Sequence, residues 1–299
     1  RTDLYGMLTY KDSFLNEDLT LNASLGAEKI EESYRVLSSN TVGDLTIPDF
    51  YNLSGSKDPV SSTNTLIQQK RDGVFLTASA GYKGFLYLDG SYRLDWNSTA
   101  NPESNRIQTL GSSLSFLAHE LLPANQTLTF FKIRAGYAEA PTFPDPYKIS
   151  AVYGVGTLYQ GNGRLSVASQ QENPNLTGGV RGEFEIGTEL RFFESKIGLD
   201  ISYFDRNDTD IPILVPLDGS TGYSSIIVNS GKQTSSGLEI GLSGDVISGK
   251  DFKWDLSVNF ATLNRFVDAL YEGIDSRNLS TYTSNMLLQE RVGEEWGAL

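Results

Sequence analysis

The sequence predicts an all-β protein, an antiparallel transmembrane β-barrel, and three observations carry this expectation. Apolar and polar residues alternate along many segments, as they do along a strand that has one apolar face. These segments reach about ten residues, whereas strands of soluble proteins usually have ~5–6 and strands that cross a membrane need ~9–11. Short turns and long loops alternate between the segments, which is typical of barrels in an outer membrane.

The clearest alternation lies in residues 182–205. On each side of the turn Glu194-Ser195-Lys196, one parity is almost wholly apolar and the other is polar. The apolar parity consists of Phe184, Ile186, Leu190 and Phe192 before the turn, and of Ile197, Leu199, Ile201 and Tyr203 after it. This pattern predicts an antiparallel hairpin with an apolar face toward lipid and a polar face toward the lumen.

The same reading predicts strands at several other places along the chain. These are residues 4–12, 18–30, 66–82, 85–96, 106–118, 128–138, 234–244, 252–266 and 282–292. Short connections fall at 13–17, 83–84, 119–127, 194–196 and 245–251, and long ones at 31–65, 97–105, 139–179, 206–233 and 267–281. If the long loops lie outside, aromatic residues gather at both ends of the strands, as in the two aromatic girdles of a barrel.

Composition narrows the classes of protein that fit. The 299 residues carry a net charge of −13 and no sustained basic patch, so a nucleic-acid partner is not expected. The chain has no cysteine, which excludes a disulfide framework and cysteine-based zinc sites. No apolar run approaches the ~20 residues of a transmembrane helix. The single histidine, His119, is expected to be a surface residue in a turn.

A series of short motifs resembles the SusC/RagA branch of the TonB-dependent outer-membrane transporters. The matching segments are 45–54 (LTIPDFYNLS), 173–176 (NPNL), 183–205, 207–211 (NDTDI), 220–223 (STGY), 229–231 (NSG), 235–239 (SSGLE), 251–254 (DFKW), 259–261 (NFA) and 292–299 (VGEEWGAL). The chain departs from the family at 177–182 (TGGVRG), where members usually carry a Trp-Glu pair. The order and spacing of the motifs over most of the chain carry the resemblance.

The resemblance implies a 22-stranded barrel of the outer membrane that is occluded by an N-terminal plug. Residues 1–299 would be a segment of that one barrel domain, roughly half of it, because Arg1 is not an initiator methionine and the last residues are not a natural terminus. The plug domain and the closing C-terminal strands are then expected outside this chain. The implied function is active import of oligosaccharides, glycans or peptides, energised through TonB and assisted by a SusD-like surface lipoprotein.

Two other functions fit the residues themselves, namely a passive porin-type barrel and a soluble β-rich adhesin or carbohydrate-binding module. No enzyme, metal or cofactor is expected. Glu183, Glu185 and Glu189 recur at strand spacing on one face without a facing acid, so they fit a solvated wall or plug contacts better than two-carboxylate catalysis. Asp205, Asp208 and Asp210 lie close together but lack the pattern of a calcium-binding loop.

Substrate is expected at the outer mouth, where long loops meet the upper wall of the lumen. Aromatic faces stack on sugar rings or pack on peptide side chains, and amides and arginines supply directional hydrogen bonds. The candidate residues are Tyr153, Tyr159, Asn162 and Arg164 of the longest loop, Phe50, Tyr51 and Tyr223 of two other loops, and Arg93, Asp95 and Glu183 of the wall just beneath. Packing of the loop aromatics on one another or on the lipoprotein stays open as an alternative role.

Overall fold

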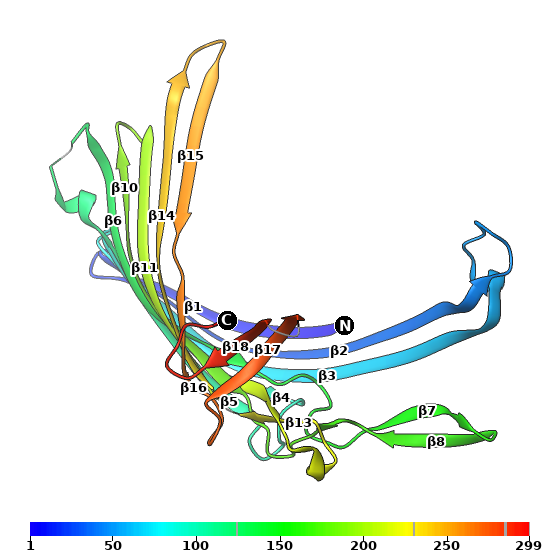
Figure 1. Cartoon of the computed structure of the whole chain (residues 1–299). Coiled ribbons are helices and arrows are strands. Elements are labelled where there is room, and N and C mark those ends of the chain that lie inside the picture. The colour runs from blue at the N-terminus through cyan, green and yellow to red at the C-terminus, as the bar shows by residue number, and fades with distance from the viewer. Residues whose placement is uncertain (124, 230, 284–285, 299) are drawn as a thin grey trace.

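The computed structural model describes residues 1–123, 125–229, 231–283 and 286–298, and one broad curved sheet dominates it (Figure 1). Eleven antiparallel strands form this sheet, in the order β1-β2-β3-β4-β5-β6-β10-β11-β14-β15, with β16 also paired to β14. They are β1 (Thr2–Phe14), β2 (Leu19–Leu45), β3 (Ser56–Tyr82), β4 (Leu86–Asn97), β5 (Arg106–Leu117), β6 (Leu128–Thr142), β10 (Gly179–Phe192), β11 (Ile197–Thr209), β14 (Lys232–Ser248), β15 (Lys253–Ala261) and β16 (Asn264–Ala269). The all-β antiparallel prediction is confirmed.

The register of the strands explains the alternation seen in the sequence. Leu190 pairs with Leu199, Leu199 with Leu242, and Leu242 with Val258, so one apolar row crosses four strands. The neighbouring row consists of Glu189, Asp200, Gly241 and Asn259 and points to the other face. The sheet therefore has an apolar face, which a membrane barrel turns toward lipid, and a polar face, which lines the lumen.

Tight turns and long excursions lie at opposite ends of the sheet. In Figure 1 the turns that join β5 to β6, β10 to β11 and β14 to β15 point to the upper left, whereas the β2–β3 tip and the β7–β8 hairpin extend to the right. The asymmetry matches the expected barrel, in which the short turns face the periplasm and the long loops face outside. We therefore call the end with the tight turns the inner end.

The loop expected at residues 31–65 is mostly strand. β2 continues to Leu45 and β3 begins at Ser56, with Glu31 paired to Lys70 and Asn40 to Ser61. The prediction was wrong because this ribbon is polar on both faces and shows no alternation, while backbone pairing needs none. Only residues 46–55, which include the short 3-10 helix η1 (Leu53–Gly55), form the tip.

Further elements occupy the other expected loops. Residues 139–179 contain β7 (Tyr153–Tyr159), β8 (Asn162–Val167) and β9 (Gln170–Gln171), and residues 206–233 contain β12 (Pro212–Pro216), η3 (Gly219–Thr221) and β13 (Ser225–Asn229). The strand expected at 252–266 is divided into β15 and β16. In place of one strand at 282–292, β17 (Ser276–Thr283) pairs with β18 (Met286–Arg291), and residues 284 and 285 lie outside the described residues.

A small apolar core lies among these outer elements. Ile213, Val215 and Val228 of β12 and β13 pack with Val267 of β16 and with Leu270. His119, in the 3-10 helix η2 (Ala118–Leu121), departs from its expected surface position. It is half-buried, its ring centroid lies 4.6 Å from that of Phe130, and its Nδ1 lies 3.3 Å from the Phe131 carbonyl oxygen. Within the described residues, no helix combines the length and apolarity needed to span a bilayer.

Candidate functional site

The polar face of β6, β10 and β11 carries a ladder of ion pairs. Arg181 bonds Asp208 through Nε–Oδ1 and Nη2–Oδ2 distances of 2.5 and 2.9 Å. One step toward the inner end, Glu183 accepts a hydrogen bond of 2.6 Å from the Arg206 Nε. The two pairs are direct cross-strand neighbours, since Arg181 is in register with Asp208 and Glu183 with Arg206. Acidic and basic groups on this part of the wall therefore neutralise one another.

Arg93 and Asp95 form a second polar centre, on β4. The Arg93 guanidinium donates to both Asp95 oxygens, at 2.7 Å each, and also bonds Glu28 of β2. It lies over Gly73 of β3, where a Cβ atom would come within 2.5 Å of Nη2, so a side chain at this position would displace the guanidinium. Asp95 is 1% exposed.

The three candidate wall residues thus have partners within the wall. Arg93 is held by Asp95 and Glu28, and Glu183 is held by Arg206. Arg93 and Glu183 keep about a third of their side chains exposed, whereas the Asp95 carboxylate is enclosed. Asp95 is better placed to hold the Arg93 guanidinium than to contact a ligand itself, and a role for these residues in substrate binding stays a prediction.

Four of the candidate loop residues lie on one hairpin, formed by β7 and β8. Tyr159 is in register with Asn162, and Arg164 with Gly156. Tyr153 and Tyr159 are each 64% exposed. The hairpin has one apolar face, because Tyr153 pairs with Val167 and Val155 with Leu165, while the alternate positions hold glycine, serine and Arg164.

The remaining loop candidates are on other elements. Phe50 and Tyr51 lie in the tip of the β2–β3 ribbon, where Tyr51 is 85% exposed. Tyr223 follows η3 and is half-buried. Figure 1 shows the β2–β3 tip well apart from the β7–β8 hairpin. The structure therefore brings Tyr153, Tyr159, Asn162 and Arg164 together on one element and leaves the other loop candidates separate.

The turn before Tyr223 is fixed by a side-chain cap. The Asp218 carboxylate accepts a 2.8 Å hydrogen bond from the Ser220 backbone N–H. Hydrogen bonds from the Ser220 side chain and backbone hold the pKa of the Asp218 carboxyl below its ordinary value, because they stabilise the charged form. The Tyr223 N–H in turn donates to the Thr221 hydroxyl at 3.2 Å, which ties Tyr223 to the capped turn.

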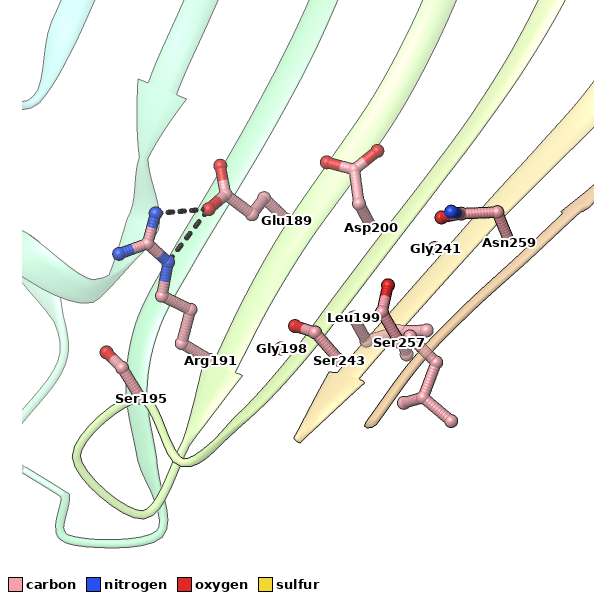
Figure 2. Close-up of a pocket in the computed structure, with 11 residues that line it drawn as sticks. Glu189, Arg191, Ser195, Gly198, Leu199, Asp200, Gly241, Ser243, Ser257 and Asn259 are labelled. Carbon is pink, nitrogen blue, oxygen red and sulfur yellow. Dashed lines mark hydrogen bonds and ion pairs between the residues drawn. The ribbon is translucent and has the colours of Figure 1, made fainter. Parts of the chain in front are cut away.

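A polar trough that the sequence analysis missed lies at the inner end of the same face. It measures about 390 Å³, and two cross-strand rows line it (Figure 2). One row is Glu189, Asp200, Gly241 and Asn259, and the other is Arg191, Gly198, Ser243 and Ser257. Glycine and serine give the trough its floor, and the Glu189–Arg191 pair closes one side, with Nε–Oε1 and Nη2–Oε1 distances of 2.8 and 2.6 Å. Glycine at polar-parity positions of adjacent strands is the signal that could have located it.

The described residues contain no group of three or more histidine, cysteine or acidic side chains placed to hold a metal ion. Of the three aspartates that lie close together in the sequence, Asp208 is bound by Arg181.

The comparisons with known proteins agree with a wall of this kind. Residues 1–293 match the family model described as TonB dependent receptor-like, beta-barrel. The chain belongs to this family. TonB-dependent receptors are outer-membrane transporters and not enzymes, so this chain is a part of an outer-membrane barrel, and the soluble module that the sequence left open is excluded.

Two curated relatives are TonB-dependent receptors of Formosa agariphila. TonB-dependent receptor P3 is 24% identical over 275 residues, which are 90% of this chain and 27% of that protein. TonB-dependent receptor P26 is 21% identical over 258 residues, which are 81% of this chain and 25% of that protein. The chain thus spans about a quarter of the length of these relatives.

Solved structures of TonB-dependent barrels show the same fold. The RagAB peptide transporter superposes with a TM-score of 0.82 at 20% identity, over 97% of this chain and 32% of that one. The siderophore receptor PirA from Pseudomonas aeruginosa superposes with a TM-score of 0.54 at 17% identity, over 89% of this chain and 44% of that one. At such identities the likeness concerns the fold alone.

Proposed function

We propose that this chain forms part of the barrel of an outer-membrane importer for oligosaccharides or peptides. The importer is energised through TonB and works with a SusD-like surface lipoprotein. One observation carries the proposal furthest: the TM-score is 0.82 with the RagAB peptide transporter and 0.54 with a siderophore receptor of the same barrel class. The sequence motifs of the SusC/RagA branch support the same choice.

The chemistry of the wall supports a polar cargo without large net charge. Several acidic and basic side chains on the polar face are paired, namely Arg181–Asp208, Glu183–Arg206 and Arg93–Asp95. Paired charges offer hydrogen-bond donors and acceptors but only a weak net field. Such a surface suits sugars and peptides, which present many neutral polar groups. A strongly charged cargo would be better served by unpaired charges of the opposite sign.

Substrate binding at the outer mouth is the corresponding proposal for the site. Tyr153 and Tyr159 present exposed rings, and Asn162 and Arg164 present polar groups on the same hairpin. Phe50, Tyr51 and Tyr223 would add contacts from other loops, with Arg93, Asp95 and Glu183 beneath them. The apolar face of the hairpin favours a second role for Tyr153, because Tyr153, Val155, Leu165 and Val167 together fit a protein surface such as that of the lipoprotein.

The proposed function is tested by uptake in cells that carry the full-length transporter. Fluorescent oligopeptides and oligosaccharides are supplied in parallel, with and without disruption of TonB. We expect one of the two classes to accumulate, and its accumulation to stop without TonB. Uptake that continues at the same rate without TonB would identify a passive porin instead. Copurification of a surface lipoprotein with the detergent-solubilised transporter tests the partner, and purification of the transporter alone would contradict it.

A further inference from the structure

The apolar face of β11, β14 and β15 has one hole in an otherwise complete lattice of side chains. Three rows cross these strands: Ile201, Ile240 and Phe260; Leu199, Leu242 and Val258; and Ile197, Gly244 and Leu256. Gly244 is the only member of the three rows without a side chain. A hollow of about 270 Å³ lies over it, bounded by Ile197, Leu242, Val246, Leu256 and Val258.

A β-bulge borders the hollow on its inner side. The register between β14 and β15 shifts between Asp245 and Ile247, so Val246 has no partner on β15 and the strand bends there. Beyond the bulge, Phe252 and Trp254 are 61% and 48% exposed. Exposed aromatic rings at this end of a barrel mark the level of the lipid headgroups. The hollow therefore lies within the hydrocarbon layer, next to the headgroups of the inner leaflet.

We propose that this hollow is a binding site for one acyl chain of a membrane phospholipid, which it retains more firmly than the surrounding lipid-facing surface does. The bilayer is the occupant that the structure favours, because the hollow is continuous with the apolar face of an outer-membrane barrel. Five of the eight residues that line the hollow are aliphatic, and the other three are Ser243, Gly244 and Asp245. An empty hollow would deprive its lining of dispersion contacts, and a flexible chain restores them.

The backbone at Gly244 can accept a side chain, which makes the site testable. A Cβ atom there would meet the Lys196 carbonyl oxygen at 3.6 Å and the Ile197 Cγ1 at 4.0 Å, both ordinary contacts. Gly244→Leu should therefore fill the hollow without forcing the strands apart. Gly90 of β4 is the matched control, because it lies on the same face between Leu88 and Tyr92 and a Cβ atom there meets nothing within 4 Å.

The experiment uses the full-length transporter in vesicles of phosphatidylethanolamine that carries a photoactivatable group in one acyl chain. After illumination, crosslinks are mapped by mass spectrometry of peptides. In the wild-type protein we expect the crosslinking yield at Ile197 and Leu256 to exceed that at Leu88 about tenfold. Gly244→Leu should remove this excess, and Gly90→Leu should leave it unchanged.

Equal yields at Leu256 and Leu88 in the wild-type protein would overturn the proposal, and this comparison does not depend on any variant's assembly. Persistence of the excess in Gly244→Leu would overturn it as well. A third outcome would also overturn the proposal: Leu256 is protected from every lipid probe, and Gly244→Leu changes the oligomeric state. A second copy of the transporter would then cover the hollow.

Discussion

Arg134 of β6 bonds Asp200 of β11 across strand β10, which lies between them. The two contacts are Nη1–Oδ2 at 2.8 Å and Nη2–Oδ1 at 2.9 Å, and the Arg134 Nε also donates to Glu185 at 3.3 Å. The guanidinium crosses β10 directly over Gly187, where a Cβ atom would lie 2.9 to 3.0 Å from its atoms. A glycine in the middle strand thus permits a polar tie over three strands of the wall.

Gly187→Val should destabilise the barrel because the valine side chain would push the Arg134 guanidinium away from Asp200. We expect a loss of about 1–3 kcal/mol in the free energy of unfolding, the usual cost of overpacking. Gly90→Val is the control, since its site is open and valine favours strands. Urea unfolding of the full-length protein in lipid measures both. Equal effects of the two variants would show that Gly187 has no special role beneath Arg134.

The assignment of the two faces predicts opposite responses to a new charge. Ile201→Arg places a cation on the lipid-facing surface and should cost ~2–4 kcal/mol near the midplane of the bilayer. Ser257→Arg places the same cation on the polar face, where water and neighbouring polar groups solvate it, and should cost much less. Asp200 is unsuitable as the control because Arg134 binds it. Similar costs at Ile201 and Ser257 would contradict the assignment of lipid and lumen faces.

Glu290 should keep the outer elements around β17 and β18 well ordered. Its carboxylate is 1% exposed and accepts hydrogen bonds of 2.8 Å each from the Gln233 amide and the Trp296 indole, besides its ion pair with Arg277. Removing one partner of a buried ion pair typically costs 3–5 kcal/mol, because the other charge is left unpaired. Glu290→Ala should therefore speed proteolytic cleavage in the outer elements while the barrel keeps its heat-modifiable mobility on gels.

The control for Glu290→Ala is Glu294→Ala. Glu294 contacts Arg291 at 3.5 Å, and both side chains are more than a third exposed, so its removal should change little. Cleavage rates that are the same in the two variants would mean that the buried carboxylate does not organise this region.

The double variant Tyr153→Ala, Tyr159→Ala should weaken substrate binding at the outer mouth. Sugar rings and peptide side chains lose their packing surface when the tyrosines are truncated, and we expect an affinity loss of about tenfold or more. Assembly of the barrel should be unaffected, because both rings are largely exposed. Isothermal titration with the transported class of substrate measures the loss.

Tyr51→Ala and Val155→Ala separate the possible readings of that result. Tyr51 is exposed on a different ribbon, so a matching loss there would extend the site to the β2–β3 tip. Val155 shares the apolar face with Tyr153 but offers no ring. If Val155→Ala and the tyrosine variant reduce copurification of the lipoprotein while leaving substrate affinity intact, the hairpin is a docking surface and the substrate site lies elsewhere.

The central strands could be predicted from the sequence because burial of one face imposes a period of two on the side chains. β10 and β11 are examples, since Phe184 to Phe192 and Ile197 to Tyr203 alternate with polar residues and the structure pairs them as expected. The outer parts of β2 and β3 could not be predicted. Neither face of that ribbon is covered by lipid or core, so residues such as Glu31 and Asn40 follow no pattern although their backbones pair regularly.

The candidate site was predictable in part for the same reason. Placing Arg93, Asp95 and Glu183 on the polar face required only the period, and the register confirms that face. Their partners were not predictable, because Glu28 is 65 residues from Arg93 in sequence and reaches it only through the order of the strands. The separation of the Tyr51 tip from the Tyr153 hairpin also depends on strand lengths that lacked a sequence signal.

The length of the β2–β3 ribbon means that a small rotation at its base produces a large displacement at its tip. Each strand has 27 residues, which is about 90 Å of extended chain, whereas crossing the bilayer takes only about ten residues. Past the pairing of Arg71 with Asn97, β3 has β2 as its one neighbour among the described strands. From Glu31 to Leu45 the arm measures about 50 Å, so a rotation of about 5° at its base moves Tyr51 by roughly 4 Å. Small changes in barrel shape near the mouth are thereby converted into displacements at the tip as large as the width of a residue.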